Sequence, residues 1–129
     1  MTFQRVFTGT PWEPRVGYCR AVRAGDHVHV SGCAPVAVDG VGVHAPGDAY
    51  AQARRCLEIA LEALEELGGT VAEVVRTRQF VTDISRWQEY GRAHGEVFRE
   101  HPPATTMVEV KALIDPEMLI EIEVDAYLG

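Results

Sequence analysis

Two segments in the last quarter of the chain alternate strictly between polar and apolar residues, which is typical of half-buried β-strands. In residues 119–128 one set of alternate positions is apolar and the other is acidic. The apolar set is Ile120, Ile122, Val124, Ala126 and Leu128, and the acidic set is Glu121, Glu123 and Asp125. In residues 105–112 the set Thr106, Val108, Val110 and Ala112 opposes the set Thr105, Met107, Glu109 and Lys111. The chain is therefore built on a β-sheet with one polar face, which is either solvated or lines a site.

The first third of the chain predicts two further strands joined by a tight turn. Residues 17–37 contain a strand, a turn at Ala24-Gly25-Asp26 and a second strand from His27 to Ser31. Glycine and aspartate tolerate the backbone angles that such a turn requires. Residues 35–47 are rich in glycine and proline and are expected to form a loop.

A first amphipathic helix is predicted after this loop. Asp48 suits its N-cap, and Gly68-Gly69 suits its end because glycine accepts the left-handed conformation without strain. Its apolar stripe comprises Ala53, Cys56, Leu57, Ala60, Leu61, Leu64 and Leu67. Thr70 and Glu73 then have the spacing of a capping box that opens a short helix, and Val74 to Val81 reads as a strand.

A second amphipathic helix follows. Ser85 and Gln88 have the spacing of another capping box, and His101-Pro102-Pro103 ends the helix because proline lacks a backbone donor. Its expected apolar side comprises Trp87, Tyr90, His94, Val97 and Phe98. The order ββαβαββ predicts a single α+β domain over residues 1–129, with both helices packed on one face of a mixed sheet.

The other face of this sheet is left uncovered by the helices. We expect it to carry Met107, Leu119 and Tyr127 beside the acidic residues. A face that is part apolar and part acidic favours an interface between copies of the chain over free solvent.

The composition argues against several classes of function. The net charge is -7 and the Lys and Arg residues are dispersed along the chain, whereas a nucleic-acid-binding protein usually has a basic patch. No apolar run approaches the roughly 20 residues that span a bilayer, and the N-terminal residues lack the pattern of a secretory signal. The three cysteines Cys19, Cys33 and Cys56 have no metal-ligand spacing. We therefore expect a cytoplasmic protein without a nucleic-acid or membrane partner.

Four motifs occur in an order that resembles the Rid (YjgF-type, RidA-like) family, whose best-known members hydrolyse reactive imines and enamines. They are Ser31-Gly32-x-x-Pro35, Phe80-Val81-Thr82-Asp83, Pro103-Ala104 before Val108-Glu109-Val110, and Ile120-Glu121-Ile122-Glu123. The resemblance covers about residues 17–128. It implies a chorismate-mutase-like fold, a homotrimer with clefts between subunits, and a small-molecule ligand without a cofactor or metal.

The resemblance also implies a catalytic residue, Glu121, because the family glutamate at this point is thought to position the attacking water. A carboxylate between apolar strand residues and other acids has a physical reason to hold its proton tightly and act as acid or base. The alternative is that Glu121, Glu123 and Asp125 form a solvated strand face.

Five further residues fall where the family places its cleft. Tyr18 and Ser31 could offer a hydroxyl to a substrate, and Gly32 could offer a backbone N–H. Cys33 follows at the expected mouth of the cleft, and Met107 stands where the family often has a cysteine. Structural readings remain open: packing for Tyr18, a strand-end hydroxyl for Ser31 and turn geometry for Gly32.

Thr105 departs from the family at an important position. The deaminating members have an arginine here, which clamps the substrate carboxylate through hydrogen bonds of roughly 1.5–3 kcal/mol each. An unpaired buried carboxylate costs on the order of 3–5 kcal/mol, so we expect poor deamination of ordinary 2-iminoacids. Lys111 and Arg20 are the candidate substitute cations, but neither matches a family position. Gly91 is a second departure, since deaminating members have a polar cleft residue there.

The histidines and Cys33 have plain structural interpretations. Cys33 would need a cation or an imidazole such as His29 to become a nucleophile, and otherwise it is a small buried hydrophobe. His27 and His29 share a strand face as metal ligands can, but zinc needs a third ligand and none is evident. His94 lies on the apolar stripe of the second helix and is expected to be a core histidine with a hydrogen-bonded ring.

Two classes of function follow from these features. The first is a RidA-like hydrolase or related catalyst that acts on an imine, an enamine or a similar small molecule, with Glu121 positioning the water. The alternative is a non-catalytic binding or regulatory trimer. A tailoring enzyme of a biosynthetic pathway would use the same cleft.

Overall fold

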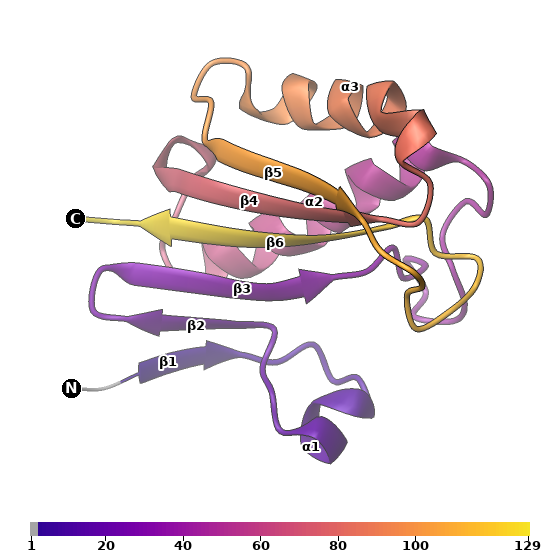
Figure 1. The fold of residues 1–129 in the computed structure, drawn as a ribbon. Helices are drawn as coiled ribbons and strands as arrows, with labels where there is room; N and C mark the ends of the chain where they lie inside the picture. Colours follow the sequence, from indigo (N-terminus) through magenta and orange to yellow (C-terminus); the bar gives the residue numbers. More distant parts are fainter. Residues whose placement is uncertain (1–2) are drawn as a thin grey trace.

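A six-stranded mixed sheet forms the centre of the protein in a computed structural model that describes residues 3–129 (Figure 1). Residues 1 and 2 of the predicted domain lie outside the described part. The strands are β1 (Phe3–Val6), β2 (Ala21–Ala24), β3 (His27–Cys33), β4 (Val74–Val81), β5 (Ala104–Glu109) and β6 (Ile120–Tyr127). Their order is β1-β2-β3-β6-β4-β5, and the β4–β5 pair is parallel while the other pairs are antiparallel.

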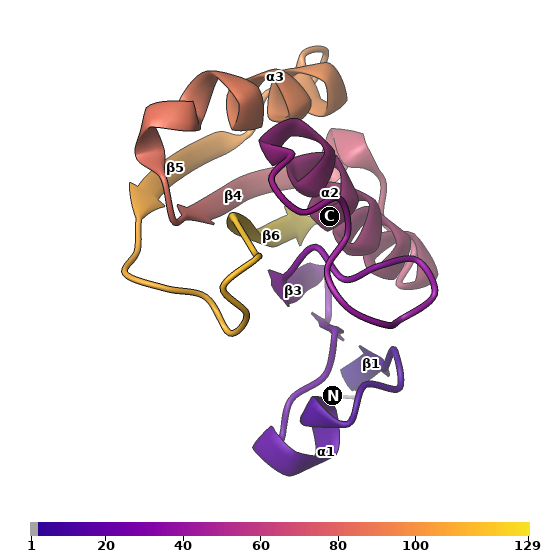
Figure 2. The ribbon, with the colours of Figure 1, turned by 90° about the vertical axis from the view of Figure 1, so that its right-hand side faces the viewer.

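Two long helices cover one face of this sheet, as Figure 2 shows. The helical segments are α1 (Trp12–Val16), α2 (Ala49–Glu66) and α3 (Trp87–Phe98), with the 3-10 turns η1 (Val71–Glu73) and η2 (Ile84–Arg86). Helix α2 packs on β3 and β6 and against α3. The predicted α+β architecture, with a mixed sheet and two helices on one face, is confirmed.

Most helix ends follow the predicted local chemistry. A carboxylate oxygen of Asp48 accepts a hydrogen bond from Ala51 N at 2.9 Å, and Gly68 adopts a φ of 91° just after α2. The predicted capping box at Ser85 is wrong. Asp83 caps η2 instead, because its side chain accepts from the backbone N–H of Ser85, and α3 begins two residues later without a side-chain cap.

The N-terminal elements β1 and α1 were not predicted from the sequence. Strand β1 is four residues long with one buried side chain, Val6, so it has no periodic signal. It forms by pairing with β2. Helix α1 depends on Glu13, which is 2% exposed and whose carboxylate accepts from Thr8 Oγ1 at 2.6 Å and from Thr10 Oγ1 at 3.1 Å.

The alternation in β6 divides the two faces of the sheet as predicted. Its apolar residues Ile120, Ile122, Val124 and Ala126 are buried under the helices. On the uncovered face, Arg78 Nη1 lies 3.0 Å from Asp125 and 3.6 Å from Glu123, and the ring of Tyr127 packs on His27.

Two expectations about side-chain placement are wrong. Met107 packs against the core on the helix side and does not lie on the uncovered face, while Leu119 is half-buried and also packs against the core. The side chain of Met107 lies on the helix side because Met107 pairs with Gln79, and paired residues of neighbouring strands share a face of the sheet; Gln79 is 3% exposed. Trp87 is 55% exposed and is not part of the apolar side of α3. In residues 3–129 no helix has the length and apolar character needed to cross a membrane.

Candidate functional site

An irregularity in β3 brings the backbone close to Glu121. Val30 and Cys33 are three residues apart and both face the core, which requires an extra residue in the strand between them. The register shift places Gly32 against Glu121. A Cβ atom at Gly32 would lie 3.0 Å from the carboxyl carbon of Glu121 and 3.1 Å from Oε2. Only glycine therefore leaves the carboxylate its present position.

Glu121 and Gly32 open into a cavity of about 780 Å³. Its walls come from the residues around α1, from the bulge in β3, from the loop after β3, from α2 and from the loop before β6. The lining residues used below are Trp12, Val16, Tyr18, Arg20, Gly32, Cys33, Arg55, Ile59, Leu113, Ile114, Met118 and Glu121. The volume is suited to a small molecule.

The carboxyl group of Glu121 has a raised pKa. Burial is the main cause, because it penalises the charged form. The positive charge of Arg20 opposes this rise in pKa, and the negative charge of Glu123 adds to it. A carboxyl group of this kind exchanges a proton closer to neutral pH than an exposed glutamate does, as an acid–base catalyst requires.

Arg20 is a cation in the wall of the same cavity. It is 7% exposed, its Nη1 donates to Gly32 O at 2.6 Å, and its Cζ lies 5.6 Å from the centre of the Tyr18 ring. From the sequence, Arg20 was a cation that matched no family position, and its burial was not predicted. The spacing of Tyr18 and Arg20 could have indicated this position, since residues two apart share one side of an extended segment.

The structure brings four of the predicted site residues into one place. Tyr18, Gly32, Cys33 and Glu121 all line the cavity. Cys33 is 1% exposed, and its burial raises the pKa of the thiol to about 11 although Arg20 lies close by. A thiol with that pKa is a poor nucleophile at neutral pH.

Ser31, which was also predicted to bind the substrate, does not line the cavity. Its hydroxyl donates to Cys19 O at 2.7 Å, which ties the bulge to the segment that precedes β2.

Thr105 and Met107 lie on the opposite face of the sheet from Glu121, at the edge strand β5. The hydroxyl of Thr105 accepts from Thr77 Oγ1 at 2.7 Å and from Gln79 Nε2 at 3.1 Å. The Oε1 atom of Gln79 is buried without a partner among the described residues. Within one chain, Thr105 therefore belongs to a different polar cluster from Glu121.

The remaining candidates have structural roles. His94 Nε2 lies 2.8 Å from Thr77 Oγ1, and burial lowers the pKa of this histidine, which confirms a hydrogen-bonded core histidine. His29 Nδ1 pairs with Asp125 at 2.8 Å on the uncovered face. In residues 3–129 no group of three or more His, Cys, Asp or Glu side chains could hold a metal ion. A Cβ atom at Gly91 would meet nothing within 4 Å.

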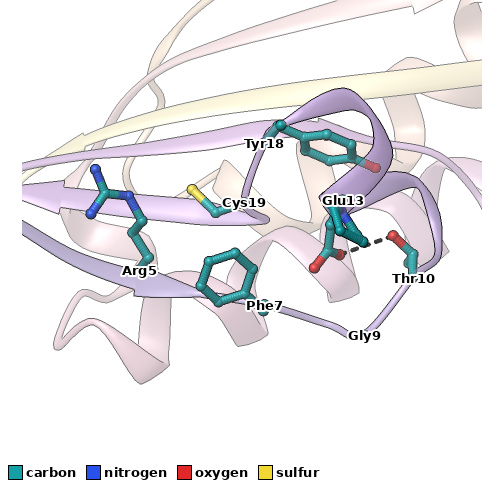
Figure 3. Close-up of a pocket in the computed structure, with 9 residues that line it drawn as sticks. Arg5, Phe7, Gly9, Thr10, Glu13, Tyr18 and Cys19 are labelled. Carbon is teal, nitrogen blue, oxygen red and sulfur yellow. Dashed lines mark hydrogen bonds between the residues drawn. The ribbon is translucent and has the colours of Figure 1, made fainter.

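A second cavity, of about 600 Å³, lies on the other side of Tyr18 and is lined by Arg5, Phe7 and Cys19 among others (Figure 3). Its carboxylate, Glu13, is turned toward Thr10 and is fully used in hydrogen bonds to the loop. Burial alone would raise the pKa of Glu13, but the hydrogen bonds from Thr8 and Thr10 lower it. This carboxylate therefore organises the wall that separates the two cavities and is not an acid–base group.

The fold and the cavity define a small α+β protein in which one partly buried carboxylate faces a small-molecule-sized space at the surface of a mixed sheet. Residues 9–128 match the family described as Endoribonuclease L-PSP. The chain therefore belongs to this family, which includes the YjgF and RutC proteins, and the predicted family is confirmed.

Individual relatives are similar over nearly their whole length. An uncharacterized protein of Streptomyces coelicolor is 39% identical over 98% of this chain and 92% of its own. The 3-aminoacrylate deaminase RutC of Acinetobacter baylyi is 36% identical over 88% of each chain. The crystal structure of Rv2704 from Mycobacterium tuberculosis, described as a member of the YjgF/YER057c/UK114 family, has a TM-score of 0.88 and 45% identity, with 98% of this chain and 99% of that one covered.

Proposed function

We propose that the protein hydrolyses a small imine or enamine in the cavity beside Glu121, releasing ammonia and a carbonyl compound. The observation that carries this proposal is the position of a partly buried carboxyl group, Glu121, in the wall of a cavity of about 780 Å³, where burial raises its pKa. Hydrolysis of a C=N bond requires a group that takes a proton from water and later gives one to nitrogen. Glu121 is suited to both steps.

The reaction balances with water as the only co-reactant. The carboxylate of Glu121 accepts a proton from water while the water oxygen bonds to the imine carbon and the C=N π electrons move to nitrogen. The carboxyl group then protonates the nitrogen, and the resulting carboxylate takes the hydroxyl proton and passes it to the same nitrogen. The C–N bond breaks, ammonia leaves, and the oxygen forms the carbonyl group. An enamine first takes a proton at carbon from the protonated carboxyl group of Glu121 and so enters as the iminium ion; the hydroxyl proton then returns to Glu121.

The comparisons support this class of chemistry over cleavage of RNA. One relative is named 3-aminoacrylate deaminase RutC, and 3-aminoacrylate is by its structure an enamine. The family description names an endoribonuclease, but a chain with a net charge of -7 is poorly suited to a polyanion. We therefore expect a small-molecule substrate.

Assembly into a homotrimer is part of the proposal. Thr105 and Met107 lie on the sheet face opposite Glu121, so they can contribute to a Glu121 cavity only in a neighbouring copy of the chain. The uncovered sheet face, with Phe80 beside Glu121 and with Tyr127, offers the surface for such contacts. In this arrangement Tyr18, Gly32 and Cys33 line the cleft from one subunit, and we expect a single trimeric species in sedimentation experiments.

The test is ammonia release from 3-aminoacrylate and from freshly generated 2-iminoacids, with wild type, Glu121→Gln and Glu62→Gln. Glu62 is an exposed residue of α2 and serves as the matched control. We expect Glu121→Gln to lose turnover by about 10²–10⁴-fold, which is the usual contribution of acid–base catalysis, and Glu62→Gln to match wild type.

Two outcomes would contradict hydrolysis at this site. Turnover that survives in Glu121→Gln would show that another group positions the water. No ammonia from any imine or enamine, together with tight small-molecule binding that survives Glu121→Gln, would favour a binding or regulatory role.

A further inference from the structure

Arg20 is a buried cation whose hydrogen-bonding capacity is only partly used. All of its hydrogen bonds are made by Nη1, which donates to Gly32 O at 2.6 Å and lies 3.4 Å from Ser31 O and 3.6 Å from Cys33 Sγ. The Nε and Nη2 atoms donate to no atom of the described residues. Gln79 Oε1 is the one fully buried side-chain polar atom without a partner in residues 3–129, so Nε and Nη2 of Arg20, a residue that lines the cavity, are not fully buried.

No carboxylate of the described part of the chain pairs with Arg20. Its neighbour in the cavity wall, Arg55, is different, because Arg55 Nη1 lies 2.6 Å from a carboxylate oxygen of Glu58 and Arg55 Nε donates to Val36 O. Arg55 is therefore already paired with a carboxylate, whereas Arg20 donates hydrogen bonds to carbonyl oxygens and a thiol and interacts with the carboxyl group of Glu121 only through its charge.

Burial lowers the pKa of Arg20, but the neighbouring Cys33, Tyr18 and Glu13 outweigh this effect and raise it. The guanidinium group is therefore charged in the cavity wall, where an anionic ligand would form charge-assisted hydrogen bonds with it.

We propose that Arg20 binds the carboxylate of the molecule that reacts at Glu121, through the unused Nε and Nη2 donors of its guanidinium group. This proposal rests on the proposed function and names the class of its substrate: an imine or enamine that carries a carboxylate. Two adjacent guanidinium N–H groups match the two oxygens of a carboxylate. Arg20 thereby supplies the anion clamp that Thr105 cannot.

The geometry of the cavity also limits the rest of the ligand. Gly32 lies between the two groups, with its carbonyl oxygen against Arg20 and its Cα beside the carboxyl group of Glu121. The carboxylate and the reacting carbon are therefore close in the ligand. The remaining walls are largely apolar, and they comprise Trp12, Val16, Ile59, Leu113, Ile114 and Met118. A substrate with an apolar body fits this cavity better than a wholly polar one.

The test measures binding without turnover, using hexanoate and hexanamide as probes of equal size. Titrations followed by NMR on the labelled protein would report the affinity and the Arg20 Nε–H resonance. Wild type should bind hexanoate at least about tenfold more tightly than hexanamide, as expected for charge-assisted hydrogen bonds. Arg20→Met should abolish this preference, Arg20→Lys should retain part of it, and Arg54→Met, an exposed arginine of α2, should leave it unchanged.

The comparison of the two probes in wild type requires no substitution, so it remains decisive if Arg20→Met fails to fold. Equal affinity for the two probes, or no binding of hexanoate, would overturn the proposal. A folded Arg20→Met that keeps the carboxylate preference would overturn it as well, since another cation would then be responsible. Binding of hexanoate that depends on Arg20, without ammonia release from any imine, would support the clamp and reject only the hydrolysis.

Discussion

Substitution of Gly32 by alanine should displace the carboxyl group of Glu121 without unfolding the protein. The new Cβ atom would lie 3.0 Å from Cδ, 3.1 Å from Oε2 and 3.2 Å from Cγ of Glu121. Carbon atoms that are not bonded are normally about 3.5–4.0 Å apart, so the carboxyl group must withdraw by roughly 0.5 Å or more. The φ angle of Gly32 lies outside the left-handed region, because Gly32 is not among the positive-φ glycines. Alanine can therefore adopt its backbone conformation.

The displacement should affect catalysis more than stability. The side chain of Glu121 borders the cavity and can move into it, so we expect the free energy of unfolding to change by less than about 1 kcal/mol. A misplacement of about 1 Å can reduce a rate by about 10²-fold, and the smaller shift here predicts a loss of roughly tenfold to a hundredfold in kcat/KM.

Ammonia release and urea unfolding would be measured on Gly32→Ala beside Gly91→Ala. Gly91 lies in α3, and a Cβ atom there would meet nothing within 4 Å. That control should keep wild-type turnover and gain up to about 1 kcal/mol from the better helix propensity of alanine. A folded Gly32→Ala with unchanged kcat/KM would refute the close packing of Gly32 on a catalytic Glu121.

Three further predictions concern single side chains. Burial raises the folded-state pKa of Glu121 above the ordinary 4.5, so the stability that this carboxyl group contributes is fully present below pH 4.5 and is lost as the pH rises through the folded-state pKa. The free energy of unfolding in urea should therefore decrease as the pH rises above 4.5 in wild type, and this decrease should be absent in Glu121→Gln. Thr105→Val removes the acceptor of two hydrogen bonds from Thr77 and Gln79 and should cost about 1–3 kcal/mol by thermal unfolding. Thr106→Val, at a neighbouring exposed position that accepts neither bond, should cost under about 0.5 kcal/mol. Burial raises the pKa of the Cys33 thiol to about 11, so a thiol reagent at pH 7.5 should react fastest with the partly exposed Cys19. Cys19→Ser should remove this fast phase of the reaction. Equal rates for the buried and exposed thiols would contradict the prediction.

The sheet and both long helices were predictable because their signals are local. Strict alternation in β6 assigns Ile122 to the core and Glu121 to the open face, and the structure agrees. The capping residue Asp48 fixed the start of α2 for the same reason, since its bond to Ala51 N depends only on residues three apart.

The orientation of β5 was not predictable from its own pattern. Alternation groups Thr105 with Met107, but it cannot say which face of the sheet they occupy. The pairing of β5 with β4 decides this, because Thr105 lies opposite Thr77, which is fully buried under the helices. The register between two strands separated by 22 residues cannot be read from the sequence of either strand alone.

The cavity was the least predictable part, because the elements that close it have no periodicity. Helix α1 is five residues long and is held in place by hydrogen bonds to Glu13. The bulge in β3 also has no recognisable sequence pattern, since a glycine such as Gly32 could mark a turn, a bulge or a close contact. Tyr18, Gly32, Cys33 and Glu121 were found through the family resemblance, and physical pattern alone would not have joined them.

The position of Gly32 explains why a cation and a carboxyl group share one cavity without pairing. If Arg20 and Glu121 formed a direct ion pair, each would satisfy the other, and the pKa of Glu121 would fall below its ordinary value. The carbonyl oxygen of Gly32 instead holds Nη1 of Arg20 at 2.6 Å, while its missing side chain makes room for the carboxyl group on the other side. Burial raises the pKa of Glu121 and the charge of Arg20 only partly offsets this rise, as expected for two groups that do not pair. One backbone residue thus keeps the proposed acid–base group and the proposed anion clamp available at the same time.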